Sequence, residues 1–463
     1  MTIRFLTSWN GYSAGDRATL SGAVEALLVA SGLARLDYVQ DGTSPLSLPN
    51  VNESRATVAA AAQRRVRSNF WSPSGRYEVV ANGADHTTAM QITLPPWYAI
   101  RFHVPNAVTS AIANCRLKFT PTATLSAAGA SQELAPSDGA WGSAVVSGSA
   151  AFSLSAAPSA GKIAYTTTDW YIGKPSLRRA GAARDVLNFR LEIPAAAANR
   201  TAYNVAGLTG LLNEADNDIG FLWRPRTAAV LGVGTLGNMT IANSVVDYLC
   251  HPVIVEYIPA IPEPSVLGLG DSIRDGSGDA NRLGYQIRAA AQVGGINYWS
   301  QAIGGSTMTD WLDRLRAVLA AGMRPTHCMV PNFSPNNAAS GTLTQAQIDG
   351  MRGYYAVIMA ELASYGIVAI PETGIPSTPG LSLGKDWGAG DALRRAWNDE
   401  QRALYGQDLV DTDAMLAGLS DADGQILIAD GLTTDGLHQN TAGTPRMVTD
   451  AARVMQRIKS GLL

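Results

Sequence analysis

A proline-dense segment divides this chain into two regions with different hydrophobic patterns. The segment is Ile258-Pro259-Ala260-Ile261-Pro262-Glu263-Pro264. Closely spaced prolines favour an extended connection over a helix or a central strand. Before the segment, short apolar runs alternate with polar residues, and after it strand-like runs alternate with helical ones. The sequence therefore predicts a domain boundary between residues 258 and 262.

The region from 46 to 258 has the pattern of antiparallel strands. Leu187-Asn188-Phe189-Arg190-Leu191-Glu192-Ile193 alternates apolar and polar side chains, as half-buried strands do. Similar short runs recur at residues 76–80, 90–94, 98–104, 116–119, 169–172, 220–223 and 252–258. Many short strands separated by Gly, Pro and Ser predict a β-sandwich or jelly-roll-like domain. The small-residue stretch Thr122 to Ala160 predicts long loops and thin edge strands.

Residues 1–45 read as a small N-terminal module. A strand is expected within Met1 to Ser8, and the spacing of apolar residues from Leu20 to Gly32 predicts a helix. This segment resembles short modules near the start of some bacteriophage proteins.

The region from 262 to 463 alternates strands with helices. Strands are expected at residues 266–269, 296–300, 326–330, 367–371 and 408–410, and helices at 282–293, 309–321, 344–365, 391–405 and 441–458. Such alternation predicts a parallel sheet covered on both faces.

Composition excludes several classes of protein. Apolar residues make up 46% of the chain and charged residues 16%, which are globular values. A net charge of −3 without a basic run does not predict a nucleic-acid partner. Neither a signal-peptide core nor a membrane-spanning run is evident. We therefore expect cytosolic synthesis, with association with a virion or release by lysis as later fates.

The three cysteines do not form a recognisable set. Cys115, Cys250 and Cys328 are far apart and odd in number, so they match neither a zinc site nor a disulfide framework. We expect all three to be buried as small apolar residues.

The tripeptide Gly270-Asp271-Ser272 follows the apolar run Ser265 to Leu269. A serine that follows a buried strand can project its hydroxyl into a cleft and act as a nucleophile. Nucleophilic chemistry also needs a base, a group that orients the base, and donors for an oxyanion.

The base must be a histidine, and only His327 and His438 lie in the α/β region. His327 is within an apolar strand, where a hydrogen-bonded structural histidine is expected. His438 precedes the last helix, with Asp435 three residues earlier. A turn of that length can bring the carboxylate of Asp435 to Nδ1 of the imidazole, although Asp-Gly is also common in surface turns.

Two loops are candidates for the oxyanion donors. Ile303-Gly304-Gly305-Ser306-Thr307 follows the second expected strand, and glycine there lets a backbone N–H approach an oxyanion. Asn332-Phe333-Ser334-Pro335-Asn336-Asn337 follows the third strand and offers an asparagine amide. The carboxyl ends of parallel strands are where open α/β sheets bind ligands.

Together these residues resemble the four sequence blocks of the SGNH (GDSL-like) hydrolases. The resemblance rests on Gly270-Asp271-Ser272, Gly305, Asn336 and Asp435-x-x-His438 and covers residues 262–463. It implies a three-layer α/β/α sandwich. It also implies that Ser272 is the nucleophile, His438 the base and Asp435 its orienting acid, with an oxyanion hole formed by Ser272, Gly305 and Asn336.

The chain departs from the family pattern in its third block. That block usually reads Gly-x-Asn-Asp, and here it is Ser334-Pro335-Asn336-Asn337. Around Ser272 the chain does not have the Gly-x-Ser-x-Gly elbow of the α/β-hydrolases, which argues against that fold.

The resemblance implies ester hydrolysis without a metal or other cofactor, often on acetylated carbohydrates. We therefore expect a serine esterase that removes short acyl groups, in particular acetyl, from a glycan. A lipase, a thioesterase or a general short-chain esterase would use the same residues. A non-catalytic glycan-binding or virion-structural protein is the third alternative.

Other parts of the chain bear on the substrate and assembly. A β-sandwich beside such a domain is often a glycan-binding module, and its aromatic candidates are Trp71, Trp97, Tyr98, Trp141, Trp170, Tyr171 and Trp223. The loop from Pro371 to Asp391, with Trp387, is the candidate lining of the acyl pocket. The sequence leaves the oligomeric state open, and a virion role would favour a trimer.

Overall fold

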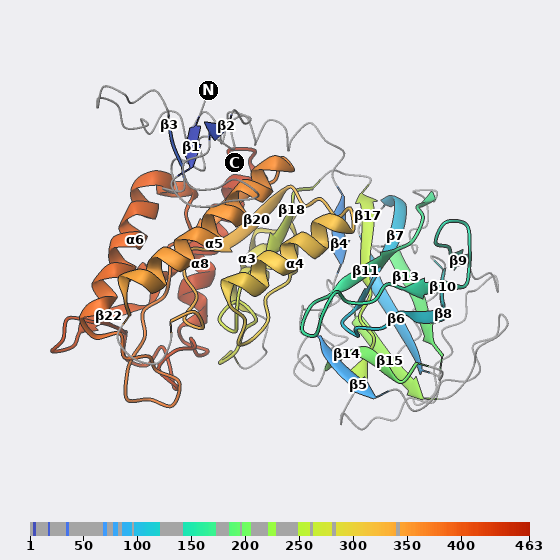
Figure 1. The fold of residues 1–463 in the computed structure, drawn as a ribbon, viewed down its shortest axis with the longest axis horizontal. Helices are drawn as coiled ribbons and strands as arrows, with labels where there is room; N and C mark the ends of the chain where they lie inside the picture. The colour runs from blue at the N-terminus through green and yellow to red at the C-terminus, as the bar shows by residue number, and fades with distance from the viewer. Residues whose placement is uncertain are drawn as a thin grey trace. The chain divides into compact units, whose positions relative to one another are not determined.

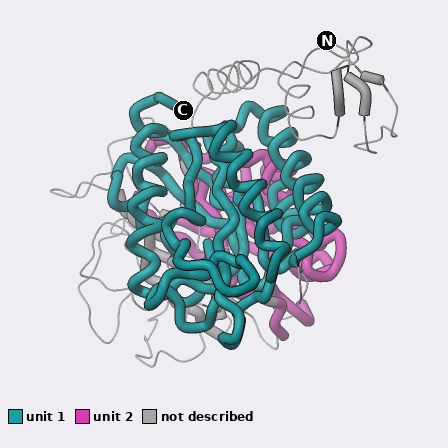
Figure 2. Tube along the Cα trace, turned by 90° about the vertical axis from the view of Figure 1, so that its left-hand side faces the viewer, with its two compact units in different colours: residues 1–67, 264–315, 324–463 teal, residues 68–263, 316–323 magenta. Residues whose placement is uncertain are grey.

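The computed structural model describes residues 3–5, 17–18, 34–36, 68–71, 77–81, 86–94, 97–120, 142–172, 185–194, 197–204, 221–227, 249–259, 263–279, 284–338 and 343–463. The chain divides into two compact units, which Figures 1 and 2 show. The first unit comprises residues 1–67, 264–315 and 324–463, and the second comprises residues 68–263 and 316–323.

Four parallel strands form the central sheet of the first unit. They are β18 (Ser265–Gly268), β19 (Asn297–Ser300), β20 (His327–Pro331) and β21 (Val368–Glu372), in the spatial order β19-β18-β20-β21. The chain runs from β18 to one neighbour and then crosses to the other. This makes the carboxyl end of β18 a topological switch point, the place where open α/β sheets bind ligands.

Helices cover both faces of this sheet (Figure 1). They are α3 (Gly284–Val293), α4 (Met308–Ala320), α5 (Gln345–Ser364), α6 (Asp391–Tyr405), α7 (Thr412–Leu416) and α8 (Thr444–Lys459). Residues of α3 and α8 share one core cluster with Val266, Met329 and Ile370 of the strands. Leu267 and Cys328, which point to the opposite face, are equally buried. The predicted three-layer α/β/α sandwich is confirmed.

Short elements complete the first unit. Two are 3-10 turns, η2 (Gly388–Gly390) and η3 (Gly406–Asp408), and two form a hairpin, β22 (Ala417–Ser420) with β23 (Ile426–Ile428). The prediction of a strand over 408–410 is wrong. Asp408 ends η3, and Val410 makes only an isolated parallel bridge with Glu372. The apolar run at 409–410 is only two residues long, too short to add a strand to the parallel sheet beyond that one bridge.

The second unit consists of antiparallel strands. They are β4 (Asn69–Trp71), β5 (Glu78–Ala81), β6 (His86–Leu94), β7 (Trp97–Asn106), β8 (Ile112–Thr120), β9 (Gly142–Ala144), β10 (Phe152–Leu154), β11 (Ala164–Thr167), β12 (Tyr171–Ile172), β13 (Asp185–Ile193), β14 (Asn199–Asn204), β15 (Phe221–Thr227), β16 (Leu249–Cys250) and β17 (Ile254–Pro259). One sheet has the order β10-β8-β13-β6-β15 and another β11-β7-β17-β4.

These two sheets share one hydrophobic core. Phe102 of β7 packs against Phe119 of β8 and Phe189 of β13, with ring centroids 5.4 and 5.5 Å apart. The strands alternate between this core and the opposite face, as the pattern over 187–193 predicts. The unit is a β-sandwich, and its jelly-roll connection stays a prediction.

The N-terminal region contributes three short strands. β1 (Ile3–Phe5) pairs with β2 (Arg17–Ala18) and with β3 (Ala34–Leu36), in both cases antiparallel. The expected strand within residues 1–8 is therefore present. The helix expected over 20–32 lies outside the described residues.

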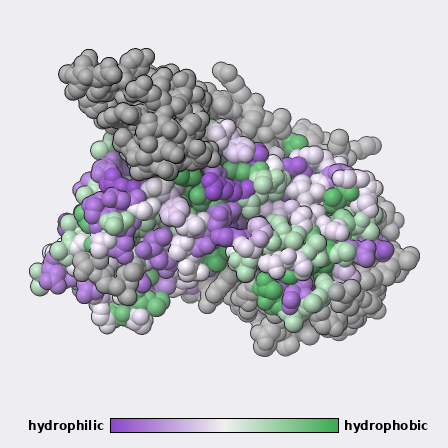
Figure 3. Space-filling view, viewed as in Figure 1, coloured by the Kyte–Doolittle hydropathy of each residue, from purple (hydrophilic) through white to green (hydrophobic). Residues whose placement is uncertain are grey.

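Two of the cysteines are buried and free, as expected. Burial raises the pKa of Cys115 to about 12, and Cys328 is fully buried in β20. The side chain of Cys250 lies outside the described part of the chain. Among the described residues, no helix combines the length and apolar character needed to cross a membrane. Figure 3 shows hydrophilic and hydrophobic residues interspersed over the described surface of one face.

Candidate active site

The candidate nucleophile lies in the first turn after β18. The carboxylate of Asp271 accepts the backbone N–H of Ile273 at 3.1 Å, and the N–H of Asp275 donates to the carbonyl oxygen of Asp271 at 3.0 Å. These bonds close a tight helical turn that begins at Ser272. Glycine is needed at 270, because a Cβ there would lie 2.7 Å from Cδ of the buried Arg274. The turn therefore holds Ser272 rigidly at the switch point.

His438 lies in the turn before the last helix, α8, and contacts Ser272, which follows the first strand of the parallel sheet. Its Nε2 lies 2.7 Å from Oγ of Ser272, and its Nδ1 lies 2.7 Å from Oδ2 of Asp435. Ser272 and His438 retain exposures of only 8% and 9%, so their hydrogen bond is largely shielded from water. The structure thus brings together the three residues predicted to form a serine, histidine and acid triad.

The turn around Asp435 fixes the orientation of its carboxylate. Oδ1 accepts the backbone N–H groups of Leu437 and His438 at 2.9 and 2.8 Å, which leaves Oδ2 for the imidazole. Burial alone would raise the pKa of Asp435, but the hydrogen bonds from His438 and Leu437 reverse the shift and lower it. An ionised Asp435 accepts a hydrogen bond from Nδ1–H, which leaves the lone pair of Nε2 directed toward Ser272.

A direct contact holds the histidine turn against the nucleophile turn. The side-chain amide of Gln439 donates to the carbonyl oxygen of Ile273 at 2.9 Å. Gly278, with φ +86°, packs so closely that a Cβ there would lie 2.9 Å from Cβ of His438. The two turns therefore keep a fixed separation.

A loop after β21 supports the other side of the histidine turn. The N–H of Leu383 donates to the carbonyl oxygen of Asp435, and the N–H of Thr378 to that of Gly436, both at 2.8 Å. Gly436 has φ +86°, and a Cβ there would lie 2.3 Å from the carbonyl oxygen of Thr378. Only glycine permits this approach.

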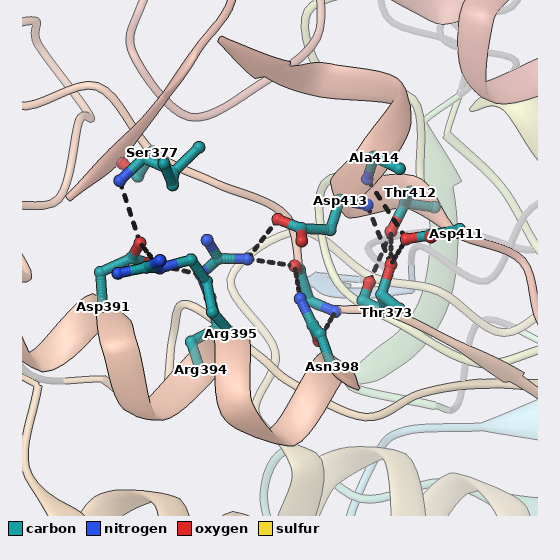
Figure 4. A network of polar contacts seen from close by, with 12 residues as sticks. Thr373, Ser377, Asp391, Arg394, Arg395, Asn398, Asp411, Thr412, Asp413 and Ala414 are labelled. Carbon is teal, nitrogen blue, oxygen red and sulfur yellow. Dashed lines mark hydrogen bonds and ion pairs between the residues drawn. The ribbon is translucent and has the colours of Figure 1, made fainter. Parts of the chain in front are cut away.

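A buried polar network anchors the start of that loop (Figure 4). Arg394 of α6 donates to Asp391 at 2.7 Å, to Asp413 at 2.5 Å and to the carbonyl oxygen of Gly374 at 2.6 Å. Asn398 also binds both the N–H and the carbonyl oxygen of Gly374, at 2.9 Å each. Burial favours a lower pKa for Arg394, yet the carboxylates of Asp413 and Asp391 raise it. The network fixes the segment after β21 on α6 and α7.

The two candidate oxyanion loops lie beside the nucleophile. A Cβ on Gly304 would lie 3.7 Å from Cβ of Ser272, so that loop contacts the nucleophile directly. Gly305 has φ +78° and open space around it. Asn336 donates its side-chain amide to the carbonyl oxygen of Ser306 at 3.0 Å. An amide nitrogen carries two N–H groups, and this bond uses one of them.

A second buried cluster lies behind the nucleophile turn. Glu372, at the end of β21, accepts hydrogen bonds from Arg274 at 3.1 Å, Tyr285 at 2.9 Å and Gln286 at 2.6 Å. Tyr298 in turn donates to Gln286. Burial raises the pKa of Glu372, and its bonds with Arg274, Gln286 and Tyr285 oppose that rise. The cluster ties the turn after β18 to the end of β21.

Two side chains noted from the sequence lie apart from the triad. His327 is buried at the start of β20, with Nδ1 2.8 Å from Oγ1 of Thr326, as expected of a structural histidine. Trp387 is fully buried and packs edge-on against Phe333, with ring centroids 5.3 Å apart. A side chain buried to this extent does not itself line a pocket, so Trp387 supports the loop from inside, and the lining role of the loop from Pro371 to Asp391 stays a prediction.

Sequence reasoning missed Glu372, Arg274 and Thr433. The hydroxyl of Thr433 accepts the N–H of Gly436 at 2.9 Å and so shapes the turn that carries Asp435. A Thr-x-Asp pattern ahead of the histidine was the available signal. For Glu372 the signal was an acidic residue at the end of an apolar strand, which requires a buried partner.

We compared the chain with known proteins by sequence and by three-dimensional structure, and the matches are to structures. No family model and no curated protein matches the chain. The chain is similar to solved structures of GDSL-like hydrolases. The residues that suggested this resemblance are those that meet at the carboxyl ends of the strands.

Three of these structures illustrate the extent of the similarity. A GDSL-like lipase from Bacteroides thetaiotaomicron is 19% identical, over 44% of this chain and 94% of that one, with a TM-score of 0.31. A member of the lipolytic G-D-S-L family from Veillonella parvula is 19% identical, over 42% and 98%, with a TM-score of 0.32. A lipase/acylhydrolase from Enterococcus faecalis is 19% identical, over 42% and 95%, with a TM-score of 0.30. The resemblance of residues 1–45 to bacteriophage modules stays a prediction.

Proposed function

We propose that this chain is a serine ester hydrolase with Ser272 as nucleophile, His438 as general base and Asp435 as the orienting acid. The observation that carries the proposal is the continuous chain of two 2.7 Å hydrogen bonds from Ser272 through His438 to Asp435. Neutral imidazole between a hydroxyl and a carboxylate is the arrangement that activates a serine for acyl transfer.

The proposed reaction proceeds through an acyl-enzyme. Oγ of Ser272 attacks the ester carbonyl carbon while Nε2 of His438 takes the hydroxyl proton. The tetrahedral intermediate then expels the alcohol, which receives that proton from His438. Water, deprotonated by the same nitrogen, attacks the acyl carbonyl carbon. The second tetrahedral intermediate breaks its bond to Oγ of Ser272, which takes that proton back from His438, and the carboxylic acid is released. Asp435 stays ionised and stabilises the imidazolium in both halves.

The oxyanion of each tetrahedral intermediate needs fixed donors. We assign these to the backbone N–H groups of Ser272 and Gly305 and the side-chain amide of Asn336. The contact of Gly304 with Ser272 and the bond of Asn336 to Ser306 support the assignment, because they keep both loops beside the nucleophile. Removing one such donor typically costs about 10²- to 10³-fold in kcat.

Hydrolysis of p-nitrophenyl acetate tests the assignment. Ser272→Ala and His438→Ala should each lose at least about 10⁴-fold in kcat relative to wild type. Ser277→Ala, a serine of the same turn whose side chain has no assigned role, is the matched control and should keep wild-type kcat. Equal rates for wild type and Ser272→Ala would remove the esterase assignment and favour the non-catalytic alternative. Full activity of His438→Ala would remove the triad.

The finer proposal is that the substrate is a short acyl ester, in particular an acetyl ester, of a glycan. Trp170 and Tyr171 of the β-sandwich are 38% and 42% exposed, and exposed aromatic rings can stack on sugars. Trp97, a further candidate, is 1% exposed and belongs to the core. The other aromatic candidates, Trp71, Tyr98, Trp141 and Trp223, lie outside the described side chains. The rate of acetate release from acetylated glycans, measured for wild type and for Trp170→Ala, tests this proposal.

A longer-chain esterase, lipase or thioesterase is the second candidate function. The observation that favours it is the exposure of Leu381 and Leu383, at 44% and 49%, on the loop that is hydrogen-bonded to Asp435. Apolar side chains beside the triad can contact an acyl chain. A series of p-nitrophenyl esters from acetate to decanoate, together with acyl thioesters, separates the two. A kcat/KM that falls with chain length supports the acetyl ester, and one that rises supports the alternative.

A further inference from the structure

We propose that Ser334 is a positioning residue that sets the geometry of the oxyanion hole by joining the three loops that form it. The proposal rests on the proposed function, since it concerns the donors of that reaction. Ser334 is not itself a donor to substrate. It is fully buried, three residues beyond the end of β20.

The hydroxyl of Ser334 contacts each of the three loops. It donates to Oδ2 of Asp271 at 3.2 Å, beside the nucleophile, and lies 3.4 Å from the carbonyl oxygen of Ser306, beside Gly305. It also accepts the backbone N–H of Asn336 at 3.3 Å. The single hydroxyl proton is shared between two acceptors, Oδ2 of Asp271 and the more distant carbonyl oxygen of Ser306, while a lone pair of the same oxygen accepts the N–H of Asn336.

The carbonyl oxygen of Ser306 is the second point where these loops meet. It accepts the side-chain amide of Asn336 at 3.0 Å, in addition to its contact with Ser334. The hydroxyl of Ser306 lies within donor distance of two carbonyl oxygens, 2.7 Å from that of Ile303 and 3.0 Å from that of Gly270, and it accepts the indole N–H of Trp311 at 3.1 Å. Gly305 is thus flanked by a residue that is bonded to both neighbouring loops.

This linkage uses the positions at which the chain departs from the family pattern. Ser334 stands where that pattern has glycine, which has no hydroxyl and could make none of these contacts. Asn337 stands where the pattern has aspartate, and its Oδ1 accepts the N–H of Met308 at 2.8 Å, at the start of α4. Both departures connect the loop after β20 to the loop after β19.

Small displacements of oxyanion donors have large effects on rate, and a misplacement of about 1 Å can cost about 100-fold. The contacts of Ser334 are at the long end of hydrogen bonding, and each is individually weak. Their importance lies in fixing three loops at once. Loss of the hydroxyl should therefore reduce kcat and leave KM nearly unchanged, because the donors act mainly in the transition state.

Ser334→Ala and Ser334→Gly test the proposal, and Ser334→Thr restores the hydroxyl. Active sites are counted by the end point of reaction with a p-nitrophenyl phosphonate, so that kcat is expressed per competent site and misfolded protein is excluded. Both hydroxyl-free variants should lose about 10- to 100-fold in kcat with p-nitrophenyl acetate, with KM within about threefold of wild type. Ser334→Thr should recover part of this loss.

The matched control is Ser265→Ala. Ser265 is also fully buried in the same sheet, and its hydroxyl accepts the N–H of Thr326 at 3.1 Å, but it lies at the opposite end of β18 from Ser272. This variant should keep wild-type kcat per site. A wild-type kcat per site in Ser334→Ala and Ser334→Gly overturns the proposal while Ser272-dependent hydrolysis still supports the proposed function. Hydrolysis that does not depend on Ser272 overturns both.

Discussion

His438 and Ser272 are separated by 166 positions in the sequence, yet Nε2 of the imidazole lies 2.7 Å from Oγ of the serine. The contact arises because the residues after β18 and the turn before α8 meet at the same edge of the parallel sheet. The next residue, Gln439, joins the same two segments, because its side-chain amide donates to the carbonyl oxygen of Ile273, also 166 positions away. The proposed chemistry depends on this meeting of the two ends of one domain.

The amide of Asn336 should be a donor to the oxyanion. Asn336→Ala removes it, and we expect kcat for p-nitrophenyl acetate to fall by about 10²- to 10³-fold with little change in KM. Asn336→Asp keeps the shape and replaces the donor by a negative charge, so its loss should be at least as large. Retention of half of the wild-type kcat by either variant would contradict the role of Asn336.

The stability of the triad turn should depend on pH through Asp435. Its pKa lies below the ordinary value of 3.8 in the folded chain, because hydrogen bonds from His438 and Leu437 outweigh burial. The unfolded chain therefore takes up this proton at higher pH than the folded chain. The carboxylate stabilises the fold fully above the ordinary value, and this contribution is lost as the pH falls through the lowered pKa.

Urea unfolding of wild type and Asp435→Asn measures this contribution. The difference in the free energy of unfolding between the two should shrink as the pH falls below about 4, where the carboxylate of wild type becomes protonated. A difference that grows as the pH falls below about 4 would show that the pKa of Asp435 is raised on folding, against the hydrogen bonds described.

Gly278 should be required for the position of His438. Alanine there would place Cβ 2.9 Å from Cβ of His438 and 2.7 Å from the carbonyl oxygen of Gln439. Gly424 is the matched control, since its φ of +80° is close to the +86° of Gly278 but nothing lies within 4 Å of its Cβ position. Both alanine variants should lose about 1–2 kcal/mol of stability through backbone strain.

Only Gly278→Ala should also displace the imidazole, and its kcat should fall by about 100-fold. The measurement is kcat with p-nitrophenyl acetate alongside urea unfolding of both variants. Equal kcat values in Gly278→Ala and Gly424→Ala would mean that the close packing does not set the position of His438.

Glu372 should be more important for stability than for chemistry. Glu372→Ala leaves Arg274 fully buried without the carboxylate that accepts its Nε–H, and breaking a buried ion pair costs about 3–5 kcal/mol. Glu372→Gln keeps an acceptor oxygen and most of the shape, so its loss should be smaller. Urea unfolding at pH 7 provides the comparison, and equal stability of Glu372→Ala and wild type would contradict a supporting role.

The sequence was sufficient for the parts of the molecule that depend on local pattern. The alternation over 187–193 predicted β13, and the β-α order after residue 264 predicted the parallel sheet and its helices. Asp435 and His438 are three positions apart and lie in one turn whose hydrogen bonds are local, so the pairing of these two residues could be predicted from spacing. The order of Ser272, Gly305, Asn336 and His438 along the chain then placed all four at one sheet edge.

Other features depend on contacts between segments far apart in the sequence. The hydroxyl of Ser334 meets Asp271 only because β20 lies beside β18, and Glu372 meets Arg274 only across the end of β21. The position of Trp387 in a long loop predicts a lining residue, but Phe333 and Arg394 pack against its ring and it is fully buried. Such packing is set by the register of neighbouring strands, which hydrophobic periodicity does not specify.

The most direct test of the proposed function is covalent trapping of the nucleophile. The full-length protein is treated with a p-nitrophenyl alkylphosphonate, and the modified residue is mapped by mass spectrometry of its peptides. We predict a single phosphonyl adduct on Ser272, formed together with loss of p-nitrophenyl acetate hydrolysis, and none in Ser272→Ala. Labelling of a different residue with parallel loss of activity, or full activity after stoichiometric labelling of Ser272, would contradict the assignment of Ser272 as nucleophile.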